Sequence, residues 1–398
     1  MMRSPSTPIK WAVVAGTTSP YLWELWGRVA QRPGHRVLFV HQERRQPSSF
    51  EHERTASWPP ELEEIRYHSQ VAASAVLPRV ARFRAQILVC LGHTNLVPLG
   101  AAALARAARQ SVTVYMGDTN GIELLKTSCS QVGVYAKLLL KREVLSRLFN
   151  HTLCLGWSNE LAAETMRLKK AVELPLYTSD FALLGRRGPL PHEWHDLAHP
   201  ILMCPARLVR QKNLEALVSA WRNVVESTDR GSLVLVGEGP LRASIERLGR
   251  DVPRSRFLMT GSIPRDSMGS AFGWADGVVL ASVEEPWGMV VPEALGLGLP
   301  VLATDHVGAA LSLRALAPGA VHVTRSDVAS LDSGLRSFMS VLESAKHAAV
   351  AASHIIRNKY DMEAVAARLA GWGEEVGEEG GWWRATAMTA VGGGDATW

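Results

Sequence analysis

The chain has 398 residues, of which 47% are hydrophobic and 20% charged, so it can build ordinary hydrophobic cores and is not expected to be disordered. At roughly 100–200 residues per domain, this length indicates two domains. The net charge of +5 is too small an excess to indicate a nucleic-acid-binding protein, and four cysteines without a CxxC pair exclude a disulfide scaffold and a cysteine-based zinc site.

The beginning of the chain shows no targeting or membrane segment. Its apolar run, Trp11–Ala15, is too short for the core of a signal peptide. No later stretch reaches about 18 uninterrupted apolar residues, the length that a membrane-spanning helix needs. We therefore expect a soluble cytoplasmic protein.

Charge is unevenly distributed between the two halves. Residues 1–180 contain 22 basic and 14 acidic side chains, and residues 181–398 contain 21 and 24, so that +8 and −3 sum to +5. A basic first half and a mildly acidic second half fit two domains with different partners. An unevenly charged solvated surface would give the same pattern.

Short apolar runs rich in β-forming residues alternate with helical patterns along the chain. In the first half, the predicted strands are Trp11–Ala15, Arg36–Val40, Ile87–Leu91, Val112–Tyr115 and Thr152–Leu155. In the second half, they are Ile201–Cys204, Ser232–Val236, Phe257–Met259, Val278–Ala281 and Val301–Ala303. Repeated strand–helix units predict parallel sheets with helices on both faces, and hence an α/β fold of two doubly wound Rossmann-like domains.

The domain boundary is expected between the two halves. Residues 181–199 are rich in Pro and Gly and have no clear period, which is typical of a linker. They would separate an N-terminal domain, residues 1–180, from a C-terminal domain, residues 200–372. The Gly-rich residues 373–398 are expected to form a mobile tail.

The stretch DGVVLASVEEPWGMVVPEALGLGLPVLATD, residues 276–305, contains the pattern with the most chemical content. A strand leads into a loop with Glu285, and a helix is expected to begin near Gly288. Open parallel sheets bind ligands beyond the carboxyl ends of their strands, so this loop should face a ligand. The backbone N–H groups of Gly288, Met289 and Val290 suit a phosphate.

Glu293 follows on the same helix, about 7.5 Å further along its axis at 1.5 Å per residue. One carboxylate on the loop and one on the helix would bracket a phosphate. A sugar nucleotide has this polarity, because hexose hydroxyls, a diphosphate and a ribose diol follow one another along the molecule.

Two further strand–helix junctions are predicted at the same edge of the sheet. In residues 205–221, Asn213 is expected to cap a helix, and Arg207 and Lys212 lie in the loop before it. Two cations converging there would neutralise a leaving diphosphate without a metal. The junction LVLVGEGPL, residues 233–241, resembles a generic nucleotide-site loop.

A basic stretch, residues 126–147, interleaves lysines and arginines with apolar residues. A solvated helix face would explain this composition. The alternative is contact with an anionic membrane surface, which would deliver a lipid-linked acceptor and would make the protein peripheral at the inner membrane face.

Together these patterns resemble the C-terminal domain of the retaining glycosyltransferases of family 4, which have the GT-B fold. Glu285 and Glu293 have seven residues between them in EPWGMVVPEALGLGLPVLAT, and RLVRQKN, VGEGPL, TGSI and WADGVVLAS occur in the expected order and spacing. The match covers nearly all of residues 200–310. It implies two Rossmann-like domains facing across a cleft, and transfer of a sugar from a nucleotide diphosphate-sugar to an acceptor hydroxyl with retention.

The first half resembles the same family more loosely. Residues 112–122 are similar to an acceptor-domain segment of a polysaccharide-type subgroup, and residues 153–181 resemble that subgroup's crossing segment. Met116 stands where the subgroup has Arg, and Thr17-Thr18-Ser19-Pro20 replaces its Gly-Gly loop. The acceptor therefore remains open between a growing glycan, a lipid-linked glycan and a small natural product.

The resemblance implies a role for each candidate residue. Glu293 would hold the ribose hydroxyls, and Glu285 would contact hydroxyls of the donor sugar. Arg207 and Lys212 would bind the diphosphate. The other residues that it places at the donor are Gly288, Met289, Val290, Gly261, Ile263, Gly237 and Thr17.

His93 and Asp118 follow strands of the N-terminal domain and would face the donor across the cleft. A packed histidine and a plain turn aspartate are the alternatives, and Gly237 would equally fit a purely conformational role. The resemblance implies transfer on the front face of the sugar, in which the departing phosphate oxygen takes the acceptor's proton. It implies neither a metal nor a cofactor, since the nucleotide sugar is a substrate.

Two other functions remain open. A nucleotide-sugar 2-epimerase shares the fold but would need acid and base groups around the hexose, and that family's pattern is not found. A catalytically silent glycan-binding protein would be free to lose Glu285 or Lys212, and this chain retains both.

Overall fold

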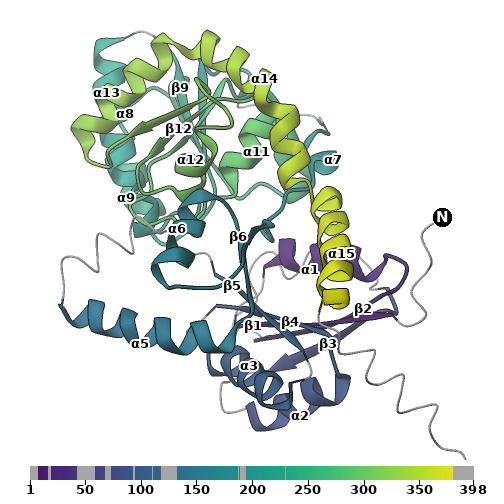
Figure 1. The fold of residues 1–398 in the computed structure, drawn as a ribbon. Helices are drawn as coiled ribbons and strands as arrows, with labels where there is room; N and C mark the ends of the chain where they lie inside the picture. The colour runs from purple at the N-terminus through teal and green to yellow at the C-terminus, as the bar shows by residue number, and fades with distance from the viewer. Residues whose placement is uncertain are drawn as a thin grey trace, which may run out of the picture.

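The structure is a computed structural model of the chain. It describes residues 8–16, 19–42, 59–67, 73–92, 95–109, 111–117, 132–186, 188, 194–228 and 230–379. Figure 1 shows two α/β domains, joined by the chain where it crosses between them.

The N-terminal domain is built on a parallel sheet with the strand order β3-β2-β1-β4-β5-β6-β7. Its strands are β1 (Ile9–Ala15), β2 (His35–Gln42), β3 (Leu62–Tyr67), β4 (Ile87–Leu91), β5 (Val112–Met116), β6 (His151–Cys154) and β7 (Ala171–Glu173). Its helices are α1 (Pro20–Ala30), α2 (Ala73–Phe83), α3 (Leu96–Ala108), α5 (Val132–Leu148) and α6 (Trp157–Thr165).

The C-terminal domain has a parallel sheet with the order β10-β9-β8-β11-β12-β13. Its strands are β8 (Ile201–Pro205), β9 (Ser232–Val236), β10 (Phe257–Gly261), β11 (Gly277–Leu280), β12 (Val301–Thr304) and β13 (Val321–Thr324). Its helical elements are η4 (Arg210–Lys212), α8 (Leu214–Ser227), α9 (Arg242–Leu248), η5 (Arg265–Ser267), α10 (Met268–Trp274), α11 (Val290–Gly296), α12 (Gly308–Leu313) and α13 (Val328–Ser340). The prediction of two doubly wound Rossmann-like domains is confirmed.

The predicted strands all occur, within two residues at each end, and the strands that the prediction missed all lie at sheet edges. These are β3, β7 and β13. β3 carries Glu63, Glu64 and Arg66 on a half-solvated strand, so it lacks the continuous apolar run of a central strand. Asn213 occupies the predicted N-cap position of α8, but its side chain makes no capping hydrogen bond. Its backbone is left-handed, with φ 53°, and its side-chain amide donates to the Ser326 carbonyl instead.

The chain crosses between the domains twice. After β7 it passes through a short helix, α7 (Phe181–Leu184), into the C-terminal domain, and it returns after α14 (Leu342–Tyr360). The last helix, α15 (Met362–Glu379), lies beside α1 in the N-terminal domain (Figure 1). It continues to Glu379, past the start of the expected tail at residue 373, and residues 380–398 lie outside the described residues.

Aromatic side chains attach α15 to the N-terminal domain. The Trp11 ring lies 5.5 Å from that of Trp26 on α1 and 6.3 Å from that of Trp372 on α15, measured between centroids. Trp11 and Trp26 are fully buried. Gly373 allows the close approach, because a Cβ there would lie 2.1 Å from the Trp11 ring.

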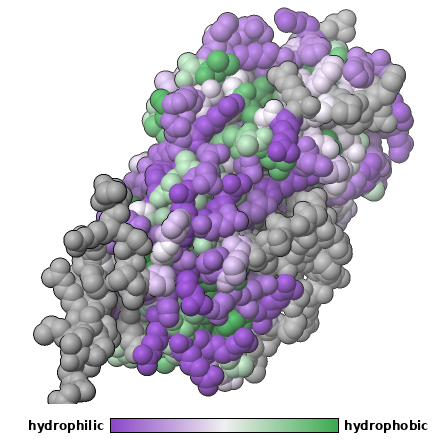
Figure 2. Space-filling model, turned by 90° about the vertical axis from the view of Figure 1, so that its right-hand side faces the viewer, coloured by the Kyte–Doolittle hydropathy of each residue, from purple (hydrophilic) through white to green (hydrophobic). Residues whose placement is uncertain are grey.

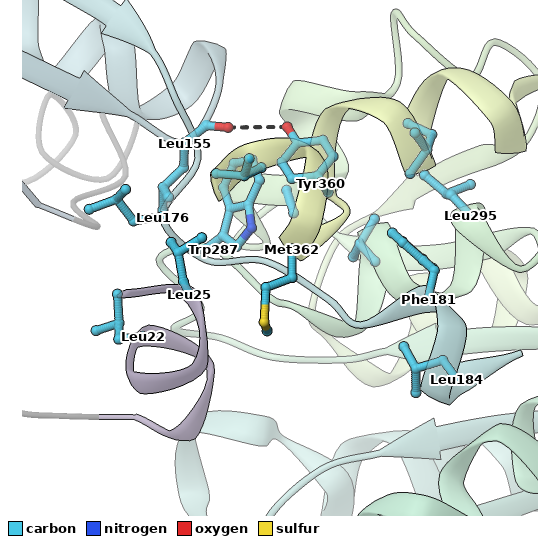
Figure 3. Close-up of a cluster of buried hydrophobic side chains, with 14 of the residues drawn as sticks. Leu22, Leu25, Leu155, Leu176, Phe181, Leu184, Trp287, Leu295, Tyr360 and Met362 are labelled. Carbon is cyan, nitrogen blue, oxygen red and sulfur yellow. Dashed lines mark hydrogen bonds between the residues drawn. The ribbon is translucent and has the colours of Figure 1, made fainter. Parts of the chain in front are cut away.

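The hydrophobic core is continuous between the two domains. One cluster of buried side chains includes residues of both sheets. Figure 3 shows its centre, where Leu22 and Leu25 of α1 approach Trp287 and Tyr360. The Tyr360 hydroxyl donates a 3.1 Å hydrogen bond to the Leu155 carbonyl, which ties the end of α14 to the end of β6 (Figure 3).

The outer surface differs from this core. On the face shown in Figure 2, the described surface is mostly hydrophilic, and hydrophobic residues form small separate areas. None of the helices within the described residues is long and apolar enough to span a bilayer.

Candidate active site

A cavity of about 880 Å³ lies between the domains, at the carboxyl ends of strands from both sheets. Tyr21, Gly92 and Gly117 line it from the N-terminal domain. The predicted site residues that line it from the C-terminal domain are Arg207, Lys212, Gly237, Ile263, Glu285, Gly288, Met289, Val290 and Glu293. Ligands of open α/β sheets bind at such an edge.

Lys212 and Glu285 form an ion pair on the cavity wall. Lys212 ends η4, and Glu285 lies in the loop after β11, so two strand–helix junctions bring the ammonium and the carboxylate together. The side chains are 20% and 14% exposed, which limits solvent screening. Ser282 donates a 3.4 Å hydrogen bond to the same carboxylate, and the exposed Arg207 lines the wall beside the pair.

Glycines shape the wall between β8, β9 and β10. Gly237 has φ 145°, and a Cβ there would lie 2.1 Å from the Ala206 carbonyl oxygen, so only glycine fits. Its N–H donates to the Gly261 carbonyl at 2.8 Å. Gly261 has φ 76° and holds the turn that leads to Ile263. Gly237 and Ile263 line the cavity, whereas Gly261 is not among the described residues that line it.

The loop before α11 also requires a glycine. Gly288 has φ 96°, and its carbonyl accepts the first bond of the helix, from the Val291 N–H at 3.0 Å. The N–H groups of Gly288, Met289 and Val290 precede the regular hydrogen bonds of the helix, and all three residues line the cavity. Beyond the other end of the helix, Gly298 has φ 79°, a conformation that favours glycine and commonly terminates a helix.

Glu293 is the buried carboxylate of the site and is only 6% exposed. Burial raises the pKa of its carboxyl group to about 7, while Arg265 and hydrogen bonds from Ser179 and Tyr21 act in the opposite direction. The Ser179 hydroxyl donates to Oε1 at 3.4 Å. A carboxylate with this pKa changes charge near neutral pH.

Three residues at this place had no signal in the sequence, namely Tyr21, Glu24 and Arg265. Arg265 follows β10 in the C-terminal domain and forms a two-pronged ion pair with Glu24 of α1, in which Nη2 and Oε2 are 2.8 Å apart. Its guanidinium lies 5.2 Å from the centre of the Tyr21 ring. Pairs between residues more than 200 positions apart leave no local pattern, so only the three-dimensional structure reveals them.

Thr17, His93 and Asp118 lie outside the described residues. Their neighbours Gly92 and Gly117 line the cavity at the ends of β4 and β5. Among the described residues, no group of three or more His, Cys, Asp or Glu side chains is placed to hold a metal ion.

Of the basic stretch, residues 126–131 lie outside the described residues, and side chains of α5 are described from residue 139 onward. Leu140 is 68% exposed and Val144, one turn later, is 43% exposed. Lys141 and Arg147 are exposed beside them. Figure 1 shows that α5 projects from the body of the N-terminal domain.

The two sheets and the cavity between them define the GT-B class of glycosyltransferase fold. Sucrose-phosphate synthase from Thermosynechococcus elongatus superimposes with a TM-score of 0.68 at 16% identity, covering 94% of this chain and 100% of that one. The Anabaena protein Alr3699/HepE, in complex with UDP, superimposes with a TM-score of 0.65 at 15% identity, covering 93% and 100%. At these identities the likeness concerns the fold.

Sequence similarity in the C-terminal domain is more informative about the family than the likeness of fold. Residues 199–340 match the family described as glycosyl transferases group 1. The sulfoquinovosyl transferase SQD2 of Arabidopsis thaliana is 29% identical over 109 residues, which are 27% of this chain and 20% of that protein. The chain thus aligns with about a fifth of the length of this relative.

Proposed function

We propose that the protein is a retaining glycosyltransferase that moves a sugar from a nucleotide diphosphate-sugar to an acceptor hydroxyl. One observation carries the proposal. One cavity is lined by the Lys212–Glu285 ion pair, by Gly288, Met289 and Val290 before α11, and by the buried Glu293, and these groups suit the diphosphate, the hexose hydroxyls and the ribose of a sugar nucleotide. The GT-B fold and the family match of residues 199–340 support it.

In the proposed reaction, the bond between the anomeric carbon and the phosphate oxygen breaks, and a bond from the acceptor oxygen forms on the same face. Lys212 and Arg207 neutralise the charge that grows on the diphosphate. The acceptor proton passes to the departing phosphate oxygen, so the scheme uses no protein base and no resident cofactor. Glu285 fixes the sugar and Glu293 fixes the ribose, which holds the anomeric carbon and the leaving phosphate in place for attack on the front face.

A donor screen tests this proposal. The protein is incubated with UDP-, GDP-, ADP- and dTDP-sugars, and release of the free nucleoside diphosphate is measured. We expect one base to be strongly preferred, and both release and nucleotide binding to fall in Glu293→Ala. Unchanged release in Glu293→Ala and Lys212→Ala would show that the site is wrongly assigned. The anomeric configuration of the product, read by NMR, tests retention, and an inverted product would refute it.

We also propose that the acceptor is carried on an anionic membrane, where α5 makes the contact. The exposed Leu140 and Val144 would enter the headgroup region, and the neighbouring cations would bind acidic lipids. The protein would then be cytoplasmic and peripheral at the inner face of the membrane. A glycan or small-molecule acceptor in solution would need no such contact.

Co-sedimentation with vesicles tests the membrane contact. We expect the protein to bind vesicles containing phosphatidylglycerol at low salt and to bind less with Leu140→Glu. Leu104→Glu is the matched control, because Leu104 is a 47% exposed leucine on α3 of the same domain. Absence of binding, or equal loss in both variants, would contradict the proposal.

A further inference from the structure

The carboxylate assigned to the ribose is held from outside its own domain. Glu293 belongs to α11 of the C-terminal domain, but the Tyr21 hydroxyl that hydrogen-bonds to it comes from α1 of the N-terminal domain. Ser179, the second donor, lies in the crossing segment just before α7. Thus the side chains that fix the direction of this carboxylate depend on how the two domains meet.

Tyr21 is itself fixed by charged neighbours. Arg265 packs over its ring and binds Glu24, which lies one turn further along α1. Arg28, the next residue on the same helix face, pairs with Asp180 at 3.0 Å. The contacts therefore form a row at helical spacing, which positions α1 against the C-terminal half and sets the place of the tyrosine hydroxyl.

We propose that Tyr21 is a positioning residue for the nucleotide, whose hydroxyl orients Glu293 toward the ribose, so that the acceptor-side domain completes the donor site. This inference rests on the proposed function. Tyr21 and Glu293 both line the cavity, so a ribose at Glu293 would lie within reach of both. A nucleotide would bind in full strength only when α1 is docked.

The charge of Glu293 provides a readout for this role. An ionised carboxylate accepts stronger hydrogen bonds from ribose hydroxyls than a protonated one does. Since burial places its pKa near 7, nucleotide affinity should rise as the pH increases through neutrality. Loss of the Tyr21 hydrogen bond removes support for the ionised form, so the midpoint should move to higher pH.

Other charged groups near Glu293 and α11 also influence the titration of Glu293. Arg265 acts on the carboxylate from η5, and Glu24 acts through Arg265 from α1. Arg357 of α14 donates to the Gly296 carbonyl at the opposite end of α11. None of these is altered by Tyr21→Phe, which removes only a hydroxyl.

The experiment measures binding of UDP and GDP to the whole protein by calorimetry between pH 5.5 and 8.5. For Tyr21→Phe we expect affinity about fivefold lower at pH 7, equivalent to one lost hydrogen bond, and a midpoint at higher pH. Tyr67→Phe is the control. Tyr67 is buried, donates to the Ala15 carbonyl at 3.1 Å and does not line the cavity, so affinity and midpoint should stay unchanged.

A nucleotide-free arm separates this inference from the proposed function. Thermal unfolding is followed against pH in wild type, Glu293→Gln, Tyr21→Phe and the double variant. Within each pair that differs only at Glu293, the difference in unfolding temperature as a function of pH reports the titration of Glu293. We expect its midpoint to rise in the Tyr21→Phe background. If no nucleotide binds to the wild type, the proposed function fails, while this arm still decides whether Tyr21 controls Glu293.

Two results would overturn the inference. One is Tyr21→Phe binding as tightly as wild type, or more tightly, because the tyrosine would then be indifferent or would block the ribose. The other is an unmoved midpoint in the nucleotide-free arm. Should Tyr21→Phe fail to fold, Ser179→Ala replaces it and is expected to shift affinity and midpoint in the same directions, because Ser179 donates to the same carboxylate.

Discussion

At the scale of single residues, the ammonium group of Lys212 is the positive charge that the proposed chemistry needs. Its ammonium lies against Glu285 in the structure, so a diphosphate would compete with this carboxylate for the same charge. The pair keeps Lys212 directed at the cavity. The carboxylate then becomes available to a donor sugar when the diphosphate takes its place.

Replacing Lys212 should therefore damage the reaction more than the fold. We expect Lys212→Ala to lower the turnover of nucleotide release by about 100-fold, because charge on the leaving diphosphate is no longer neutralised. Lys346→Ala is the control, since Lys346 forms a comparable half-buried pair with Asp276 away from the cavity. Similar turnover in the two variants would contradict the role of Lys212.

Glu293 predicts a dependence of stability on pH. Its pKa in the folded protein, about 7, lies above the ordinary 4.5, so folding favours the protonated form. The contribution of Glu293 to the free energy of unfolding is fully favourable below pH 4.5 and is lost as the pH rises through 7. At about 1.4 kcal/mol per pKa unit, the loss is on the order of 3 kcal/mol.

Glu293→Gln removes this penalty. We expect the variant to unfold at a higher temperature than wild type at pH 8.5, and at nearly the same temperature at pH 5, measured by calorimetry. A difference that is equal at both pH values would show that Glu293 is not the titrating group.

At the scale of elements, the junction of β9 with the following loop requires a glycine at position 237. Gly237→Ala would place a methyl group 2.1 Å from the Ala206 carbonyl oxygen at φ 145°. We expect a loss of about 1–3 kcal/mol in unfolding free energy and weaker nucleotide binding, since the cavity wall must move.

Gly371→Ala is the matched control for that substitution. Gly371 lies inside α15, and no heavy atom lies within 4 Å of the Cβ that alanine would add. There the substitution should stabilise the protein by about 0.5–1 kcal/mol through helix propensity. Denaturant unfolding of both variants should give opposite signs, and equal signs would contradict this account.

The accuracy of the sequence-based prediction depends on where an element lies in its sheet. Ile87–Leu91 is a central strand, buried throughout, and its continuous apolar run gave its bounds correctly. β3 and β7 are the two edge strands of the sheet and carry exposed charges, so their composition resembles that of loops. Asn213 occupies the N-cap position that its residue type predicts, but its side chain donates a tertiary hydrogen bond to the Ser326 carbonyl and makes no capping bond.

At the scale of the whole molecule, one wall of the site could be predicted and the other could not. Lys212, Glu285 and Glu293 stand in local motifs after β8 and β11, which are neighbours in the sheet, so topology alone brings them to one edge. Tyr21 and Arg265 meet only because the two domains pack against each other. Residues joined by domain packing have no spacing that a motif could record.

At this scale, the packing of α15 against the N-terminal domain can be tested by substitution. Gly373→Ala would bring a methyl group to 2.1 Å from the buried Trp11 ring, whereas the Cβ of Gly377→Ala would meet no atom within 4 Å. Both changes favour a helix equally, so their difference isolates the packing. We expect Gly373→Ala to be less stable by about 1–3 kcal/mol and to expose α15 to limited proteolysis.

Equal stability of Gly373→Ala and Gly377→Ala, with equal resistance to protease, would show that packing against Trp11 does not stabilise α15. The measurement is best made by chemical unfolding with a parallel digest. Mass spectrometry then places the cleavage sites relative to Trp372.

The return of the chain to its first domain also determines an order of events during synthesis. Trp11 and Trp26 are translated before the C-terminal domain, but Trp372, the third ring of their cluster, is translated after it. Domains generally fold as units while the chain emerges, the N-terminal one first. Here the N-terminal domain is completed only after the C-terminal domain, and the apolar face that Trp372 covers stays exposed until the whole C-terminal domain has been made.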